Sequence, residues 1–207
     1  MKLQLVASLS VLSSLFLCAP SFAQSAAPGS AQEGQTKSTA CVACHGVDGN
    51  SSNPQWPTLA GQHRQYIAKQ LRAFKSGTRK DPLMSPMAAS LSDDDIEDLA
   101  AYFNAQKPAG LEADPSKVQL GQRLYRGGDT RAALTACAAC HGPEGRGNPA
   151  ASYPAIRGQH STYVAAQLRA YRAGTRTTDQ NQMMRTVANT MSDEQIKALA
   201  SYVQGLR

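Results

Sequence analysis

The sequence reads CVACHGVDGN at residues 41–50 and CAACHGPEGR at residues 137–146. Each stretch begins with Cys-x-x-Cys-His, the attachment signal for c-type haem. Its two thiols lie about one helical turn apart, so both can add to the vinyl groups of one porphyrin, and the histidine then becomes the proximal iron ligand. The two stretches therefore predict two covalently bound haem c groups. The predicted haem-binding residues are Cys41, Cys44 and His45 in the first stretch and Cys137, Cys140 and His141 in the second.

Other uses of paired cysteines suit this pattern poorly. A structural zinc site would combine the two Cys-x-x-Cys pairs, but they are far apart in the sequence and a histidine follows each of them. A thioredoxin-like redox pair would need a βαβ context, and no strand pattern surrounds either motif. A disulfide framework would not repeat with a histidine attached.

Residues 1–23 are predicted to be an export signal that is removed. Met1 and Lys2 give a short positive start, a mostly apolar run follows, and residues 21–23 place small side chains where a signal peptidase cleaves. The apolar run is too short and interrupted to span a bilayer. Removal takes Cys18 with it, so all remaining cysteines lie in the haem motifs. We expect a soluble protein of the bacterial periplasm.

Three blocks of the sequence occur twice in the same order. The first is the haem motif, and the second is GQHRQYIAKQLRAFKSGTR at 61–79 against GQHSTYVAAQLRAYRAGTR at 158–176. The third is LSDDDIEDLAAYF at 91–103 against MSDEQIKALASYV at 191–203. The chain is therefore predicted to be a tandem duplication of one domain.

The breaker sequence KPAG at 107–110 separates the two repeats. The predicted domains are 24–108, which holds haem 1, and 109–207, which holds haem 2. The first domain carries eight basic and eight acidic side chains, whereas the second carries twelve and seven. This balance does not indicate nucleic-acid binding. It does predict a higher reduction potential for haem 2, because positive charge disfavours the oxidised iron.

The third block predicts an amphipathic helix in each domain. Ser92 and Ser192 are placed as N-caps, and Asp95 and Gln195 three residues later complete capping boxes. Apolar residues then recur with the spacing i, i+3, i+4, i+7. These residues are Ile96, Leu99, Ala100 and Phe103 in the first domain and Ile196, Leu199, Ala200 and Val203 in the second.

Glycines and a proline delimit the other predicted helices. The middle block has a helical pattern that ends at Gly77 or Gly174, a residue suited to the left-handed position after a helix. Asp114-Pro115 gives an N-cap and an N1 proline for a helix that runs to Gly127-Gly128. A weaker helical pattern covers 32–39. The predicted fold class is all-α, with the same set of helices in both domains.

The second axial ligand of each iron decides the function. An open iron permits catalysis, whereas methionine gives a closed, six-coordinate iron with a high potential, suited to electron transfer. When the domains are aligned back from the last helix, Met84 aligns with Met184. This is the one aligned position at which both domains have a methionine, called here the shared methionine column. We predict that a loop returns this methionine to the iron. Met87, Met183 and Met191 face other residue types and are interpreted as core packing.

Two further pairs of aligned residues carry hypotheses about the haem surroundings. Pro57 and Pro154 could each offer a carbonyl to the second ring nitrogen of the proximal histidine, or be ordinary turn prolines. Arg79 and Arg176 could pair with haem propionates, or be solvated surface arginines.

His63 and His160 also align and are the alternative axial ligands. Ligation of iron by two histidines would lower its potential. Both residues lie at the start of a helix, where an imidazole more often makes a local hydrogen bond or faces solvent.

With these motifs the chain resembles the dihaem cytochrome c4 family. The resemblance rests on tandem class I cytochrome c domains with Cys-x-x-Cys-His, the G-Q-x-x-x-Y-x-x-x-Q-L segment and a downstream methionine, and it covers essentially the whole sequence after the signal. It implies two pseudo-twofold related lobes whose haem edges face each other. It also implies periplasmic electron transfer from a cytochrome bc complex towards a haem–copper terminal oxidase. One departure is that the loop before Met84 is three residues shorter than the loop before Met184.

Two other functions remain open at this point. A dihaem peroxidase or small dehydrogenase would need an open or reactive iron, whereas both domains offer the same methionine and no extra segment for a substrate pocket. A cytochrome subunit of a periplasmic dehydrogenase would dock through a surface that leaves no motif, and peripheral attachment to a membrane is equally invisible. We expect a monomeric electron carrier that is not an enzyme and that binds redox partner proteins.

Overall fold

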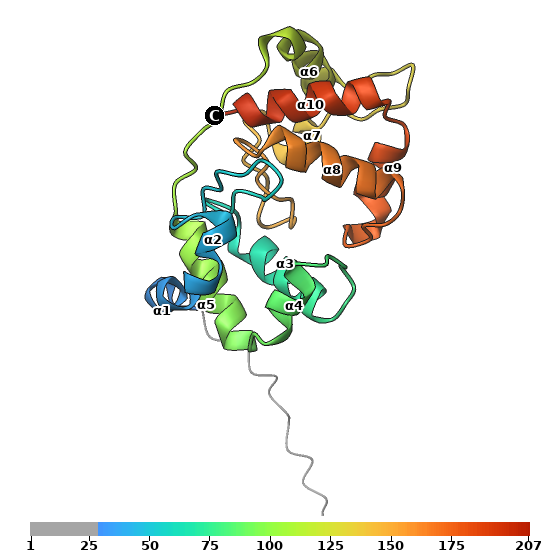
Figure 1. The fold of residues 1–207 in the computed structure, drawn as a ribbon. Coiled ribbons are helices and arrows are strands. Elements are labelled where there is room, and N and C mark those ends of the chain that lie inside the picture. Colours follow the sequence, from blue (N-terminus) through green and yellow to red (C-terminus); the bar gives the residue numbers. More distant parts are fainter. Residues whose placement is uncertain (1–28) are drawn as a thin grey trace, which may run out of the picture.

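The computed structural model describes residues 29–207, so the predicted export signal at 1–23, including Cys18, lies outside the described residues. Figure 1 shows two helical bodies, one above the other, each built from one half of the sequence. Within the described range the β-type contacts are two isolated bridges, Asp129–Leu134 and Asn148–Tyr153. The predicted all-α fold class is confirmed.

In residues 29–207 the two halves repeat the same series of five α-helices, with a 3-10 helix at a different place in each. The first half contains α1 (Ala31–Lys37), the 3-10 helix η1 (Ser38–Ala40), α2 (Val42–His45), α3 (Arg64–Lys75), α4 (Met84–Ala89) and α5 (Asp93–Ala105). The second half contains α6 (Pro115–Gly127), α7 (Ala138–His141), α8 (Ser161–Arg172), the 3-10 helix η2 (Gln180–Gln182), α9 (Met183–Asn189) and α10 (Asp193–Gly205). In this part of the chain no helix is long and apolar enough to cross a bilayer.

The predicted helix starts are confirmed by their caps. The Ser92 hydroxyl accepts a hydrogen bond from the N–H of Asp95, and the Asp95 carboxylate accepts one from the N–H of Ser92. Ser192 and Gln195 form the same capping box at the start of α10. Asp114 caps α6 and is followed by proline at the first helical position. These caps satisfy N–H groups that the first turn of a helix leaves free.

Each half has its own hydrophobic core, formed around its last helix. The predicted apolar positions of α5 and α10 are all exposed by 3 % or less. The first helix of each half crosses the last helix at a glycine. A Cβ atom on Gly34 would lie 2.0 Å from the carbonyl oxygen of Asp98, and one on Gly121 would lie 2.4 Å from that of Ala198. The helices approach this closely because these two residues have no side chain.

The segments before α5 and α10, which hold the aligned methionines, each contain a short helix that the sequence did not predict. Asp81 begins α4 by accepting hydrogen bonds from the N–H groups of Leu83 and Met84, both at 2.9 Å. Asp179 supports α9 by accepting from the N–H and the Nε of Arg185, at 3.0 and 2.9 Å. Helices of six and seven residues are too short to show an apolar period, so only these local caps could have predicted them.

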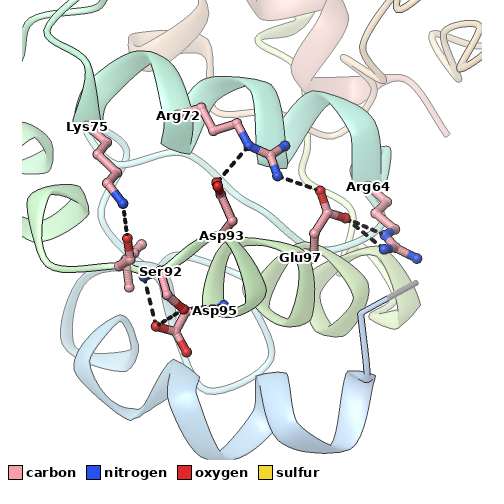
Figure 2. A network of polar contacts seen from close by, with 8 residues as sticks. Arg64, Arg72, Lys75, Ser92, Asp93, Asp95 and Glu97 are labelled. Carbon is pink, nitrogen blue, oxygen red and sulfur yellow. Dashed lines mark hydrogen bonds and ion pairs between the residues drawn. The ribbon is translucent and has the colours of Figure 1, made fainter. Parts of the chain in front are cut away.

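In the first half, ion pairs join α3 to α5 (Figure 2). Glu97 accepts hydrogen bonds from Arg64 at 2.7 Å and from Arg72 at 3.0 Å, and Arg72 also reaches Asp93 at 3.2 Å. In the second half Lys197 occupies the position of Glu97. The two cores are therefore alike, but their polar contacts differ.

Candidate haem sites

Each Cys-x-x-Cys-His unit forms one helical turn, α2 or α7. The N–H of His45 donates to the carbonyl of Cys41, and the N–H of His141 donates to that of Cys137, both at 2.9 Å. The histidine therefore follows its cysteine pair within a single turn, as the spacing predicted. All four thiols are free and half-buried.

The histidines of the two motifs are oriented by proline carbonyls. Nδ1 of His45 lies 2.8 Å from the carbonyl oxygen of Pro57, and Nδ1 of His141 lies 3.0 Å from that of Pro154. A carbonyl can only accept, so Nδ1 carries the proton and Nε2 keeps the lone pair that a metal needs. Both rings are buried, and burial lowers the pKa of each histidine, which favours the neutral form.

The thiols fit thioether attachment rather than a cluster of metal thiolates. Burial raises the pKa of Cys41, and it raises the pKa of Cys137 to about 11, so both thiols are protonated at neutral pH. In residues 29–207 no group of three or more His, Cys, Asp or Glu side chains is arranged to hold a metal ion. Two thiols for thioether bonds and one imidazole nitrogen for the iron, all within one turn, are what haem c requires.

The aligned methionines both lie at the start of a short helix. Met84 is the first residue of α4 and Met184 is the second residue of α9, and both side chains are half-buried. Of the other methionines, Met191 belongs to the core at 4 % exposure, as expected. Met87 is 46 % exposed, so its interpretation as a core residue was wrong.

The expectation that the aligned histidines face solvent or make a local hydrogen bond was wrong for His160. His160 is 6 % exposed, and its Nε2 donates across the interface between the halves to the carbonyl of Ser51, at 2.8 Å. The Nε2 of His63 is buried and has no hydrogen-bond partner within the described residues. His160 therefore uses the nitrogen that would otherwise bind a metal.

Two arginines cross between the halves in opposite directions. Arg79 donates to Tyr163 Oη at 3.0 Å and to Gln167 Oε1 at 2.9 Å in the second half. Arg176 donates to Tyr66 Oη at 2.8 Å and to Gln70 Oε1 at 3.1 Å in the first half. The guanidinium of Arg79 also lies 4.5 Å from the ring centre of Phe74, and that of Arg176 lies 4.6 Å from that of Tyr171. The contacts are reciprocal, as a pseudo-twofold interface requires.

Arg176 is only 6 % exposed, so the alternative that it is a solvated surface arginine was wrong. Among the described residues, neither Arg79 nor Arg176 forms an ion pair with a carboxylate. A buried cation without an anion, as at Arg176, is costly, so this interface suits an anionic group.

Sequence reasoning did not single out the tyrosines and glutamines of this interface. The sequence did contain a sign of them, because the middle block is identical at twelve of nineteen positions. A shared helical core alone requires fewer identical residues. Four of the identical polar positions in that block meet across the interface. They are Gln62, Tyr66, Gln70 and Arg79 in the first half and Gln159, Tyr163, Gln167 and Arg176 in the second.

An all-α fold that carries two Cys-x-x-Cys-His sites, each with an oriented histidine, defines a c-type cytochrome with two haem-binding domains. The family model for cytochrome c matches residues 31–107 and again residues 118–207. Cytochrome c4 of Azotobacter vinelandii is 47 % identical over 190 residues, which cover 87 % of this chain and 90 % of that protein. The chain belongs to the cytochrome c family and, within it, to the dihaem cytochrome c4 family.

Two further comparisons extend this result. The crystal structure of reduced recombinant cytochrome c4 from Pseudomonas stutzeri has a TM-score of 0.84 and 46 % identity, covering 86 % of this chain and all of that one. A thiosulfate dehydrogenase electron acceptor of Stutzerimonas stutzeri is 40 % identical over 167 residues, covering 79 % of this chain and 77 % of that protein. The chain is an electron-transfer dihaem cytochrome, and its two haem c groups are covalently bound through the cysteines of its two motifs.

Proposed function

We propose that this protein carries electrons in the periplasm from a cytochrome bc complex towards a haem–copper terminal oxidase. Each haem supplies a one-electron ferric–ferrous couple. The protein is a carrier and not an enzyme, and its two domains, 24–108 and 109–207, follow an export signal at 1–23. It is a monomer that meets its partners through protein surfaces, at the membrane surface or in solution.

The proposed iron ligands are His45 and Met84 for haem 1 and His141 and Met184 for haem 2. The observation that carries this proposal is the matched pair of hydrogen bonds from the histidine Nδ1 atoms to Pro57 and Pro154, at 2.8 and 3.0 Å. They fix the proton on Nδ1 in both halves and so aim Nε2 at a metal. A thioether on the opposite face would close each iron to substrates, which leaves electron transfer as its chemistry.

Arg79 and Arg176 are the proposed partners of the haem propionates. Their guanidinium groups meet at the interface between the halves, where tyrosine and glutamine side chains hold them. Propionates would supply the negative charge that Arg79 and Arg176 lack among the described side chains. This arrangement would turn the propionate edges of both haems toward the shared interface.

A second candidate partner is a thiosulfate dehydrogenase. It is favoured by the relative named as the electron acceptor of that enzyme, which is 40 % identical to this chain. On this proposal the protein would take electrons from a periplasmic dehydrogenase instead of a cytochrome bc complex.

Stopped-flow reduction tests the choice between these partners. The oxidised holoprotein is mixed with a reduced cytochrome bc complex, and separately with a thiosulfate dehydrogenase and thiosulfate, while both haems are followed by absorbance. Rapid reduction by the bc complex alone would support the first proposal, and rapid reduction by the dehydrogenase alone would support the second. A peroxide turnover assay on the same sample would contradict the carrier proposal if the protein consumed peroxide catalytically.

A further inference from the structure

Two glutamines cross the interface and pair with a residue of the opposite half. Gln159 accepts a hydrogen bond from the N–H of Thr58 at its Oε1, and its Nε2 donates to the carbonyl of Thr58, both at 2.9 Å. Gln62 makes the same two contacts with Ala155, at 3.0 and 2.7 Å. Thr58 and Ala155 occupy the same position in the two repeats. The two contacts are therefore reciprocal.

A third hydrogen bond fixes the orientation of each amide. Oε1 of Gln159 also accepts from the N–H of His160 at 3.1 Å, and Oε1 of Gln62 accepts from that of His63 at 2.9 Å. Turning either amide would place its NH2 group against two N–H donors. Each glutamine oxygen is thus held as an acceptor for the opposite half.

The peptide group that each glutamine holds is the one that orients a proximal histidine. The N–H of Thr58 belongs to the same peptide group as the carbonyl of Pro57, which accepts from Nδ1 of His45 at 2.8 Å. In the second half, the N–H of Ala155 and the carbonyl of Pro154 form the peptide group that accepts from His141. Each histidine is therefore linked, through one peptide group, to a glutamine of the other half.

Hydrogen bonds in such a chain strengthen one another. When Gln159 Oε1 accepts from the N–H of the peptide, the peptide is polarised and its carbonyl becomes a better acceptor. A better acceptor at Nδ1 makes the imidazole of His45 a more basic metal ligand. A more basic ligand favours the ferric over the ferrous iron and lowers the reduction potential.

We propose that Gln159 lowers the reduction potential of haem 1 and that Gln62 lowers that of haem 2. Each glutamine is a positioning residue that acts across the interface on the proximal histidine of the other half. The inference rests on the proposed ligation of iron by His45 and His141. Its distinctive consequence is a crossed effect, in which a substitution in one half changes the haem of the other half.

The test is a potentiometric titration of the holoprotein, with each haem assigned by NMR of its proximal histidine ring. In Gln159→Leu we expect the potential of haem 1 to rise, so that its ferric-to-ferrous ratio at a fixed potential falls several-fold, while haem 2 is unchanged. The Nδ1–H resonance of His45 in the reduced protein should move upfield as its hydrogen bond weakens. Gln62→Leu should give the mirror result at haem 2.

Two more variants distinguish the proposed effect from a general disturbance of the interface. Gln159→Glu keeps the acceptor for the N–H of Thr58 but loses the donor to its carbonyl, and its added negative charge should make the potential of haem 1 fall instead of rise. His160→Asn removes a different hydrogen bond across the interface, the one to Ser51, and should leave both potentials unchanged.

A shift confined to haem 2 in Gln159→Leu, equal shifts of both haems, or no shift at either haem would overturn the inference. In that case a normal His–Met spectrum of the wild-type protein would leave the proposed ligation standing. Absence of that spectrum in the wild type would reject the proposed ligation itself.

Discussion

At the scale of single residues, the axial methionines are the most consequential prediction. Met184→Ala should open the iron of haem 2, because alanine cannot replace the thioether ligand. We expect loss of half of the near-infrared band of Met-ligated ferric haem, carbon monoxide binding by haem 2 after reduction, and a lower potential for that haem. Haem 1 should be unaffected.

Met87→Leu is the matched control, because Met87 is exposed and lies outside the shared methionine column. It should leave the near-infrared band and the carbon monoxide response as in the wild type. Carbon monoxide binding by Met87→Leu, or its absence in Met184→Ala, would contradict the assignment of the ligands.

The cysteines that attach the two haems could be predicted because haem attachment depends only on local spacing. Cys-x-x-Cys-His needs only one helical turn, and α7 forms that turn. The interface residues could not be predicted, because the role of Arg176 depends on a tyrosine 110 positions away. Aligning the two halves shows that both have arginine at this position. The alignment does not show which side chain of the other half each arginine contacts.

At the scale of helices, the crossings of α1 with α5 and of α6 with α10 depend on glycine. Gly121→Ala should destabilise the protein by about 1–3 kcal/mol, the usual cost of overpacking, because its Cβ would lie 2.4 Å from the carbonyl oxygen of Ala198. Gly127→Ala in the same helix is the control, because nothing lies within 4 Å of its Cβ. Thermal unfolding of both variants checks this, and equal stabilities would contradict the close packing.

Helix ends and apolar faces were predictable because caps and periodicity act within a few residues. The glycines of the crossings were not recognised, since Gly34 and Gly121 stand inside helices, where glycine is normally unfavourable. Their role becomes clear only once two helices distant in sequence are brought together. The short helices α4 and α9 were not predicted for a different reason, because they have too few residues to show an apolar period.

The helix contacts of the two halves should also respond differently to acid. Lys37 of α1 pairs with Asp95 at 2.8 Å and with Asp98 at 2.6 Å, and these bonds hold the pKa of both carboxyls below their usual range. Burial tends to raise the pKa of Glu97, but its hydrogen bonds from Arg64 and Arg72 outweigh this and lower it. In the second half these three positions are Gln195, Ala198 and Lys197.

A carboxyl whose pKa is lowered by folding stabilises the protein fully above its unfolded pKa, which is about 4. That stability is lost as the pH falls through the folded pKa. We therefore expect amide protection in α1 and α5 to fall before that in α6 and α10 as the pH is lowered from 5 to about 2. Hydrogen exchange by mass spectrometry measures this order, and Asp98→Asn should reduce the difference. Simultaneous loss in both halves, or earlier loss in α6 and α10, would contradict it.

At the scale of the whole molecule, the two repeats share a fold but differ in net charge. The second half carries twelve basic and seven acidic side chains against eight and eight in the first. Positive charge disfavours the ferric haem, so haem 2 should have the higher potential, and electrons entering at haem 1 should come to rest on haem 2. Titration of each assigned haem at low and high salt checks this. The gap should narrow with salt, and a higher potential for haem 1 would contradict it.

On the proposed ligation both irons lie in matching, closed His–Met sites, and carbon monoxide binding is the sharpest test of this. The reduced native protein is exposed to carbon monoxide while its Soret spectrum is recorded, and the haem content of the same sample is counted. The proposed ligation predicts two haems per chain and an unchanged spectrum, because neither iron has a free coordination position. Carbon monoxide binding by either haem of the native protein, or a single haem per chain, would contradict it.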